Sequence, residues 1–315
     1  MMNGFRVIGV AGAALLTGGL MAGTASAAPK AVPKASTVST ASSAVAAACE
    51  VNLGSVTAAG DHRSQVFSAT VPPTRTIDKI VGRGVYPAGL AWRSGPMLAD
   101  PNAGGPDVSG YLILANGMYR SRYAASYDTG EIFSSSLERV GGGWGIYTVF
   151  DESVYQDAGF SRTNEYGMRS DGLLYRWTLD SKGVWRNATT YPGFGAVKTM
   201  VLISKTRTYD TFLANTRGGA LYTIHIPTTS PMKPVVKVVR SSTWQGFDSL
   251  VAAGCGQYGV LLLGIDKDTG SGHMYAVGHA NGTATVIQSR GSLPATFVDP
   301  VYFRWTLPIA PLNGE

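Results

Sequence analysis

The sequence predicts an all-β protein built from a repeated unit of about four strands, and three observations support this prediction. Short apolar runs alternate with turns rich in Gly, Asn, Asp, Pro and Ser, while amphipathic helical patterns are almost absent. An aliphatic residue or Met followed by an aromatic residue recurs at a period of about 50 residues. Single aromatic landmarks recur at nearly the same period.

The first 27 residues have the features of an export signal. Arg6 supplies a positive charge, the apolar run "VIGVAGAALLTGGLMAG" follows it, and Ala25-Ser26-Ala27 forms a cleavage site. A membrane anchor is the competing interpretation, but the apolar core is short and rich in glycine. Residues 28–48 are mainly Ala, Ser, Thr, Pro and Lys, which cannot bury enough apolar surface to fold. We therefore expect a secreted, extracellular protein with a signal peptide at 1–27, a disordered spacer at 28–48 and a folded domain at 49–315.

The recurring apolar pair indicates strands that are covered on both faces. Successive side chains of a strand point to opposite faces, so a sheet with one face in water alternates apolar with polar residues. Two large apolar residues in succession predict burial on both sides. Four of the five pairs follow an evident turn such as Asn116-Gly117. The pairs are Val66-Phe67, Met118-Tyr119, Leu174-Tyr175, Leu221-Tyr222 and Met274-Tyr275.

The aromatic landmarks set the blade count. A four-stranded sheet that is apolar on both faces must pack between copies of itself, and a radial array of such sheets is a β-propeller. The last landmark begins an inner strand at 296–306, and the strands "CEVNLGSV", "SQVFSATV" and "TRTIDKIV" have no inner strand of their own. We expect a five-bladed β-propeller of four-stranded antiparallel blades, closed by a composite N-/C-terminal blade. The landmarks are Tyr86, Trp144, Phe194, Phe247 and Phe297.

The two cysteines are expected to form a disulfide. An exported protein meets an oxidising environment, and two cysteines make one bridge. Cys49 begins the second strand of the composite blade, and Cys255 follows the inner strand of the preceding blade. The two residues are therefore predicted to be neighbours across one blade interface.

The order of motifs resembles the tachylectin-like five-bladed propeller lectins over residues 49–306. The resemblance lies in "GGWGIYTVF" and "PGFGAVKTMV", followed by "SDGLLYRW" and "RGGALYTI". It departs from the family where Tyr86 stands in "VYPAGLAW" in place of Gly-Trp, and in the inserted "ADPNAGGPDVSG". The resemblance implies non-covalent binding of N-acetylated sugars at blade interfaces and assigns no individual ligand residue.

Candidate sugar-binding residues follow from the chemistry of sugars. A pyranose needs an aromatic face for its C–H side and a few fixed polar groups for its hydroxyls. The alternative is that the tryptophans pack between blades, which we favour for Trp144, whereas Trp177 and Trp185 are the better candidates for exposure. The candidates near blade boundaries are Trp144, Trp177, Trp185, Trp244, Arg186 and Asn187.

Catalysis is the less favoured alternative. The sequence has no G-x-S-x-G elbow, no H-E-x-x-H and no Walker loop. "GCGQYG" matches G-x-G-x-x-G, but a strand-like run follows it in place of a helix, so we expect a turn. A secreted glycosidase would use two carboxylates near the central channel, for which Asp299 and Asp151 are the candidates.

Charge and metal-ligand spacing narrow the choice of partners. The formal net charge is +6 with scattered Lys and Arg, which disfavours a nucleic-acid surface. The four histidines lack metal-ligand spacing, and "DKDTGSG" lacks the bidentate Glu of a calcium loop, so we expect no metal and no cofactor. We expect a monomer that binds carbohydrate or a glycan-coated surface. A protein-binding or wall-associated scaffold is a further alternative.

Overall fold

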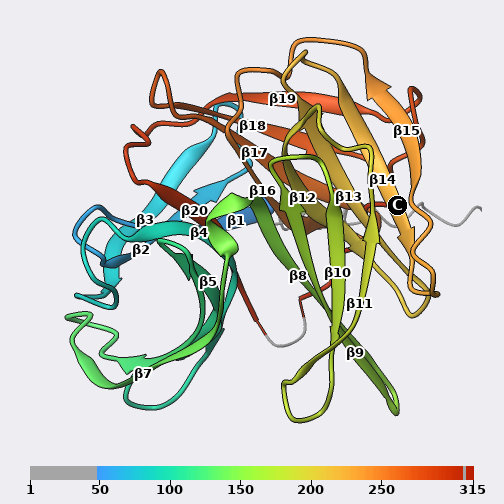
Figure 1. Cartoon of the computed structure of the whole chain (residues 1–315). Helices are drawn as coiled ribbons and strands as arrows, with labels where there is room; N and C mark the ends of the chain where they lie inside the picture. The colour runs from blue at the N-terminus through green and yellow to red at the C-terminus, as the bar shows by residue number, and fades with distance from the viewer. Residues whose placement is uncertain (1–47, 308–309) are drawn as a thin grey trace, which may run out of the picture. The chain divides into compact units, whose positions relative to one another are not determined.

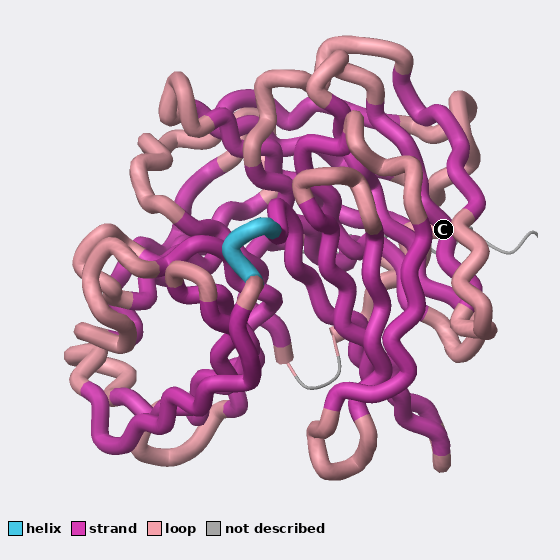
Figure 2. The backbone as a smooth tube through the Cα atoms, in the orientation of Figure 1, coloured by secondary structure: helices cyan, strands magenta, loops and turns pink. Residues whose placement is uncertain are grey.

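Strands make up nearly all of the regular structure in the part of the chain that the computed structural model describes, residues 48–307 and 310–315. One three-residue 3-10 turn, Trp144–Ile146, is the cyan segment of Figure 2. The all-β prediction is confirmed for these residues. The predicted signal peptide and all but the last residue of the predicted spacer lie outside them. In the described part of the chain, no helix has the length and apolarity to cross a membrane.

Three sheets contain four antiparallel strands each, arranged in chain order from one edge to the other. Short turns connect consecutive strands, as the spacing of apolar runs and turn residues predicts. The first sheet is β8 (Tyr147–Asp157), β9 (Phe160–Arg169), β10 (Leu174–Leu179) and β11 (Trp185–Tyr191). The second is β12 (Val197–Lys205), β13 (Tyr209–Thr216), β14 (Leu221–Pro227) and β15 (Val235–Arg240). The third is β16 (Ser249–Cys255), β17 (Gly259–Asp266), β18 (Ser271–Val277) and β19 (Ile287–Ser292).

The fourth sheet unites strands from both ends of the described chain. Its order is β3-β2-β1-β20-β4-β5-β6-β7, and β1 pairs antiparallel with β20 through residues such as Gly54 and Phe303. Strands near residue 50 and near residue 300 thus share one sheet, as the sequence predicts. The strands are β1 (Glu50–Val56), β2 (His62–Ser68), β3 (Thr74–Gly82), β4 (Ala91–Asp100), β5 (Asp107–Leu114), β6 (Gly117–Ala125), β7 (Ile132–Gly142) and β20 (Val301–Thr306).

This sheet has eight strands where the sequence predicts two separate sheets of four. The pairing of β20 with β1 ends at Arg304, so the last two residues of β20 are free to pair on their own. Trp305 lies beside Met97 and Thr306 beside Leu98 in a short parallel contact with β4. The expectation of fully separate sheets was therefore wrong at this junction.

The first strand of each group of four contacts its neighbours. β4 contacts both β8 and β20, β12 contacts β8 and β16, and β16 contacts β20 and β1. Apolar clusters fill the spaces between the sheets, and strand β17 shows what this means for one strand. Leu261 and Leu262 are consecutive and fully buried, yet they belong to two different clusters. Burial on both faces, the basis of the fold prediction, is confirmed for this strand.

The recurring apolar pairs are buried unequally. The aliphatic or Met residue is buried in all five, whereas only Phe67 is buried among the aromatic members. The four tyrosines, such as Tyr175, are partly exposed. The expectation that both members are buried was thus wrong for these four units. A phenolic hydroxyl requires a hydrogen-bond partner or water, which Phe67 does not.

A repeated hydrogen bond explains the aromatic landmarks. In each unit the backbone N–H of a landmark donates to a carbonyl in a turn between two strands. These are the turns before β2, β6, β10, β14 and β18. The fourth landmark in this series is Trp244, not Phe247 as the sequence suggested. Trp244 donates to the Gly219 carbonyl at 2.9 Å, and Phe247 follows it as a second buried ring. The other pairs are Tyr86 to Gly60, Trp144 to Asn116, Phe194 to Gly172 and Phe297 to Gly270.

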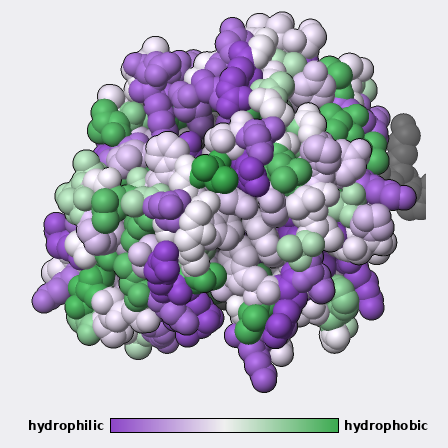
Figure 3. Space-filling view, viewed as in Figure 1, coloured by the Kyte–Doolittle hydropathy of each residue, from purple (hydrophilic) through white to green (hydrophobic). Residues whose placement is uncertain are grey.

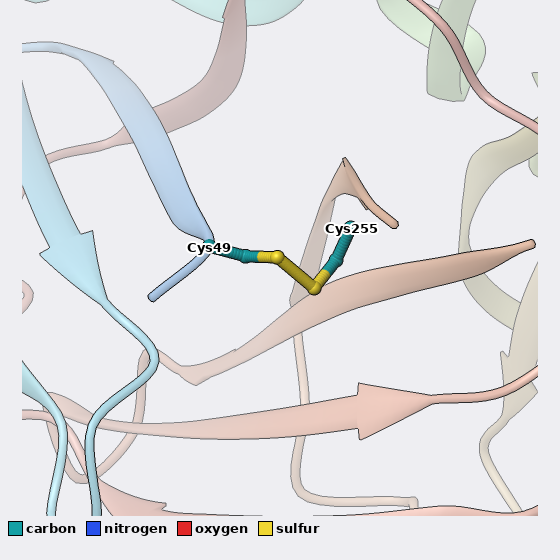
Figure 4. The surroundings of a disulfide bond; sticks show 2 residues. All are labelled: Cys49 and Cys255. Atoms are coloured by element: carbon teal, nitrogen blue, oxygen red, sulfur yellow. A yellow bond between two sulfur atoms is a disulfide. The ribbon is translucent and has the colours of Figure 1, made fainter. Parts of the chain in front are cut away.

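The predicted disulfide between Cys49 and Cys255 is confirmed (Figure 4). It joins the residue before β1 to the last residue of β16, with the two Cα atoms 5.6 Å apart. The bond closes a loop of 206 residues in sequence. Such a closure restricts the unfolded chain strongly, because the loop entropy grows with length.

Replacing both cysteines by Ala should lower the free energy of unfolding by up to about 5 kcal/mol, since the long loop is released in the unfolded state. Urea unfolding followed by fluorescence measures this change. Addition of a thiol reductant should bring the wild type to the stability of the Cys49→Ala/Cys255→Ala variant and leave the variant unchanged. A wild type that is insensitive to the reductant under unfolding conditions would contradict the prediction.

A buried ion pair holds the β8–β11 sheet against the β12–β15 sheet. Asp210 on β13 is fully buried and accepts hydrogen bonds from Arg162 at 2.7 and 2.8 Å. Ser153, Asn164 and Tyr166 donate to the same carboxylate. All the donors come from β8 and β9, so the carboxylate draws the two sheets together. Removing one partner of such a pair is strongly destabilising, because it leaves a buried charge without compensation.

Arg162→Met should therefore lower the free energy of unfolding by about 3–5 kcal/mol, because it leaves the Asp210 carboxylate buried without its cation. Chemical denaturation measures the loss, and the double variant Arg162→Met/Asp210→Leu should recover part of it. Arg186→Met is the matched control, because the Arg186–Asp180 pair is exposed. Equal effects of Arg162→Met and Arg186→Met would refute this account of the inter-sheet contact.

Candidate ligand-binding site

The first strands of the sheets surround a narrow internal cavity of about 70 Å³. Residues of β4, β8, β12, β16 and β20 line it, including Asp151 and Arg304. A wider cavity of about 420 Å³ shares several lining residues with it, so the two adjoin. We call the wider cavity the mouth. It is lined by Ala91, Trp92, Arg93, Thr148, Lys198, Arg217, Asp248, Lys267 and Pro300.

Three residues of the mouth are extra residues in their strands. The pairing of β4 with β5 shifts around Trp92, that of β8 with β9 shifts around Thr148, and that of β12 with β13 shifts around Lys198. A β-bulge of this kind leaves one residue unpaired and redirects its side chain, and bulges are common beside functional sites. The same local irregularity therefore brings three different strands' side chains to the mouth.

Trp92 is the exposed aromatic residue of the mouth. Its side chain is 42% exposed, and its indole N–H donates to the Tyr147 carbonyl at 3.1 Å. The Arg93 guanidinium lies over the indole ring, with its central carbon 4.3 Å from the ring centroid. One face of Trp92 thus has a cationic neighbour, and a hydrogen bond holds the ring in place. This is a rigid aromatic surface of the kind that binds the apolar face of a ligand.

The polar groups of the mouth are also fixed. Arg93 donates to the Thr148 carbonyl at 2.7 Å, and the Lys267 ammonium donates to the Pro300 carbonyl at 2.5 Å. Lys198 pairs with Asp248 at 2.8 Å. Burial, and after it the neighbouring Arg93 charge, lower the pKa of Lys267 to about 8. These groups are arranged for binding without reorganisation.

Three carboxylates lie close to one another beside the mouth. Oxygens of Asp248, Asp266 and Asp268 fall within 4.8 Å of each other. Asp266 accepts the Asp268 and Thr269 amides, and Asp248 accepts the Lys267 amide and pairs with Lys198. These are the contacts of a turn between β17 and β18, which is the structure that we expected for "DKDTGSG".

Three of the predicted sugar-binding tryptophans gather in one cluster between the β4–β7 and β8–β11 strands. Trp144 is buried, with its ring centroid 5.3 Å from that of Trp177 and 5.5 Å from that of Trp185. Trp177 stacks on Tyr175, and Trp185 stacks on Phe150. Trp177 and Trp185 are only partly exposed, because other rings cover their faces. Packing between sheets, the alternative favoured for Trp144, describes its position.

The remaining predicted ligand residues lie apart from each other. Trp244 is buried as the fourth landmark and contacts Phe247 and Tyr275. Arg186 is exposed on β11 and pairs with Asp180, and Asn187 next to it has a left-handed backbone with φ of 51°. None of these residues lines the mouth.

The two predicted catalytic acids have separate surroundings. Asp151 lines the narrow cavity, is buried, and accepts the amides of Leu202 and Glu152 at 2.9 and 2.8 Å. Burial raises the pKa of Asp151. Asp299 is also buried, but it accepts a hydrogen bond from Ser55 at 2.5 Å and does not line that cavity. The two acids are held by different partners and do not share a site.

A third carboxyl group is buried more deeply than either of these. Glu165 on β9 lies opposite Glu152 on β8 and is fully buried. As a carboxylate it has no hydrogen-bond donor among the described residues, whereas as the neutral acid it can donate a hydrogen bond to the Glu152 carboxylate. Burial raises the pKa of Glu165 well above its usual range, and the charge of Glu152 raises it further. The side chain is therefore more stable as the neutral acid in the folded protein.

Sequence reasoning missed the residues of the mouth, and for Asp248 the cause is a landmark placed three positions late. Three mouth residues each follow a landmark by four positions. They are Thr148 after Trp144, Lys198 after Phe194 and Asp248 after Trp244. With Phe247 taken as the fourth landmark, Asp248 fell out of this series. Trp92 follows Tyr86 in the most divergent unit, so the periodicity alone carries no signal for it.

Comparisons with known proteins place the chain near no described family. No family model matches it, and no curated protein matches it. Among solved structures it is similar to the WD40 domain of SCAP from fission yeast, with a TM-score of 0.32 and 10% sequence identity. The similarity covers 80% of this chain and 58% of that chain, so this chain spans less than two thirds of it. A likeness of this degree carries no statement about function.

Glu165→Gln should reduce the pH dependence of stability. A carboxyl group whose pKa is raised by folding stabilises the protein below its unfolded-state pKa, and this contribution is lost as the pH rises through the folded-state pKa. The free energy of unfolding of the wild type should therefore fall as the pH rises above the usual carboxyl range, and the fall should be smaller in Glu165→Gln. Denaturant unfolding at a series of pH values measures both slopes. The exposed Glu138→Gln variant should keep the wild-type slope, and a wild-type slope in Glu165→Gln would refute the assignment.

Proposed function

We propose that the described strands form a closed, five-bladed propeller whose axis is the narrow cavity. Each blade would comprise four strands, with β20, β1, β2 and β3 as the composite blade. The proposal is supported by the successive contacts among β20, β4, β8, β12 and β16, which return from β16 to β20. The pairing of β20 with β4 is then a contact between two neighbouring blades.

We propose that this secreted propeller binds carbohydrate non-covalently at the mouth. The observation that carries the proposal is Trp92, an exposed indole that its hydrogen bond to Tyr147 holds at the rim of the cavity. A sugar ring would place its C–H face on the indole and its hydroxyls against Thr148, Lys198 and Asp248, which line the same cavity. The tachylectin-like resemblance, with N-acetylated sugars as ligands, supports the same class of ligand. The blade-interface sites that it implies remain a prediction.

Binding without turnover is the version of this function that the geometry favours. A glycosidase needs two carboxyl groups about 5–10 Å apart across the bond that is cleaved. Asp151 and Asp299 have different partners, and the Asp299 oxygen is held by Ser55 and lies 3.6 Å from Arg63. Neither acid lines the mouth, where the proposed ligand would lie.

A protein-binding scaffold is the second candidate, and strand β15 is the observation that favours it. β15 is an edge strand, and Val235, Val236 and Val238 are exposed on it. An exposed apolar edge can accept a strand from a partner protein. In the orientation of Figure 1, Figure 3 shows hydrophobic residues in small separate patches among hydrophilic ones.

Trp92→Ala should weaken binding of N-acetylglucosamine oligomers at least about tenfold, because it removes the aromatic surface and leaves the polar groups. A glycan array followed by calorimetry on the best ligand measures the change. Phe133→Ala is the control, since Phe133 is exposed on β7 outside the mouth and should leave the affinity unchanged. Unchanged affinity in Trp92→Ala would refute the site. Release of reducing sugar by the wild type that Asp299→Asn abolishes would favour the enzyme. Neither sugar binding nor sugar release would favour the scaffold.

A further inference from the structure

The mouth carries more positive than negative charge. Four cationic side chains line it, and one carboxylate does so. That carboxylate, Asp248, already pairs with Lys198 at 2.8 Å. The charges that remain are those of Arg93, Arg217 and Lys267, and Arg217 is exposed and donates to the carbonyls of Gly195 and Val197. Arg93 and Lys267 are therefore the cations whose charge the ligand would meet inside the cavity.

Arg93 and Lys267 are held in place by neutral groups. Both donate to backbone carbonyls, at Thr148 and Trp92 for Arg93 and at Pro300 for Lys267. Neither forms an ion pair with a carboxylate in the described part of the chain. A backbone carbonyl orients a cation but does not neutralise it, so both charges remain available to a ligand.

The surroundings make these two charges unfavourable as they stand. Burial lowers the pKa of Arg93 and of Lys267, and the Arg93 charge lowers that of Lys267 as well, while the Asp248 carboxylate offsets only part of these shifts. Two partly desolvated cations that face the same cavity repel each other, and an anion between them would relieve both the repulsion and the lost hydration. A cavity of about 420 Å³ leaves room for such a group beside a sugar ring.

We propose that the sugar bound at the mouth carries an anionic substituent, which lies between the Arg93 guanidinium and the Lys267 ammonium while the sugar ring contacts Trp92. The inference rests on the proposed sugar binding and adds the class of sugar. The shared chemistry is an oxyanion, and a carboxylate, a sulfate ester and a phosphate ester all supply it. Fixed cations at one end and an aromatic ring at the other would discriminate acidic sugars from neutral ones.

One sugar with and without an acidic substituent tests the inference. N-Acetylglucosamine is the neutral reference, N-acetylmuramic acid adds a carboxylate, and the 6-sulfate and 6-phosphate of N-acetylglucosamine add the other two oxyanions. Calorimetry on the wild-type protein should show at least one acidic sugar bound about tenfold or more tightly than the neutral one, because charge-assisted hydrogen bonds add to the same ring contact. The acidic sugar with the highest affinity identifies the substituent.

Variants of Lys267 assign the preference to the site. Lys267→Met removes one of the two charges with little change in volume and should lower the ratio of acidic-sugar to neutral-sugar affinity several-fold, while the Arg93 charge stays. Lys267→Arg keeps the charge and should keep the preference, which separates a charge effect from damage to the fold. Lys182→Met is the control, because Lys182 is exposed and lies outside the mouth. An unchanged ratio of acidic-sugar to neutral-sugar affinity in Lys267→Met overturns the inference.

The pH dependence supplies a second readout. Lys267 faces Arg93 of β4, Asp248 before β16 and the Tyr302 ring of β20, with its ammonium 5.7 Å from that ring. Its pKa of about 8 predicts that affinity for the acidic sugar falls between pH 7 and 9, while affinity for the neutral sugar stays level. Equal affinities for all four sugars would overturn the anionic class and leave sugar binding intact. Binding of inorganic sulfate or phosphate with no contribution from any sugar ring would overturn sugar binding itself.

Discussion

The structure depends on the need of each sheet to be covered on both of its faces. Consecutive buried residues such as Leu261 and Leu262 on β17 belong to different apolar clusters, so neither face of this strand can be left in water. The aromatic rings that cover the faces of a sheet also fit closely against its glycines. A side-chain carbon at Gly264 would come within 2.7 Å of the Phe247 ring, and one at Gly167 within 2.8 Å of the Tyr147 ring. Aromatic rings therefore occupy the space that other residues would need at these glycines.

Polar contacts then decide how neighbouring sheets are placed. The bond from each landmark N–H to the preceding turn carbonyl recurs in every unit, and it ties one group of strands to the next at the same height. Four positions after a landmark, at or next to the start of the following strand, lie Thr148, Lys198 and Asp248. The mouth is thus a product of the repeat, and the bulges at Trp92, Thr148 and Lys198 turn its side chains toward one cavity.

The charged groups follow different rules in the interior and at the mouth. Inside, Asp210 has Arg162 and three neutral donors, and Glu165 is stabilised as the neutral acid. At the mouth, Arg93 and Lys267 keep their charges without a carboxylate of their own in the described residues. The Asp210–Arg162 pair and the neutral Glu165 serve the fold, whereas the fixed cations of the mouth can take an anionic partner from outside. This contrast is the physical reason for assigning ligand binding to the mouth and not to the buried acids.

The sequence by itself determined the strands, the sharing of one sheet by residues near both ends, and the partners of the disulfide, because apolar alternation, turn residues and the repeat are local patterns. It did not determine the roles of individual aromatic residues. Trp144 and Trp244 were candidate sugar-binding residues, but both are buried. Trp92 stands outside the periodic pattern, yet it is the exposed aromatic residue of the mouth. Which side chains face the mouth depends on bulges and on contacts between strands far apart in the chain. Those are properties of the packed sheets, so only the tertiary structure decided them.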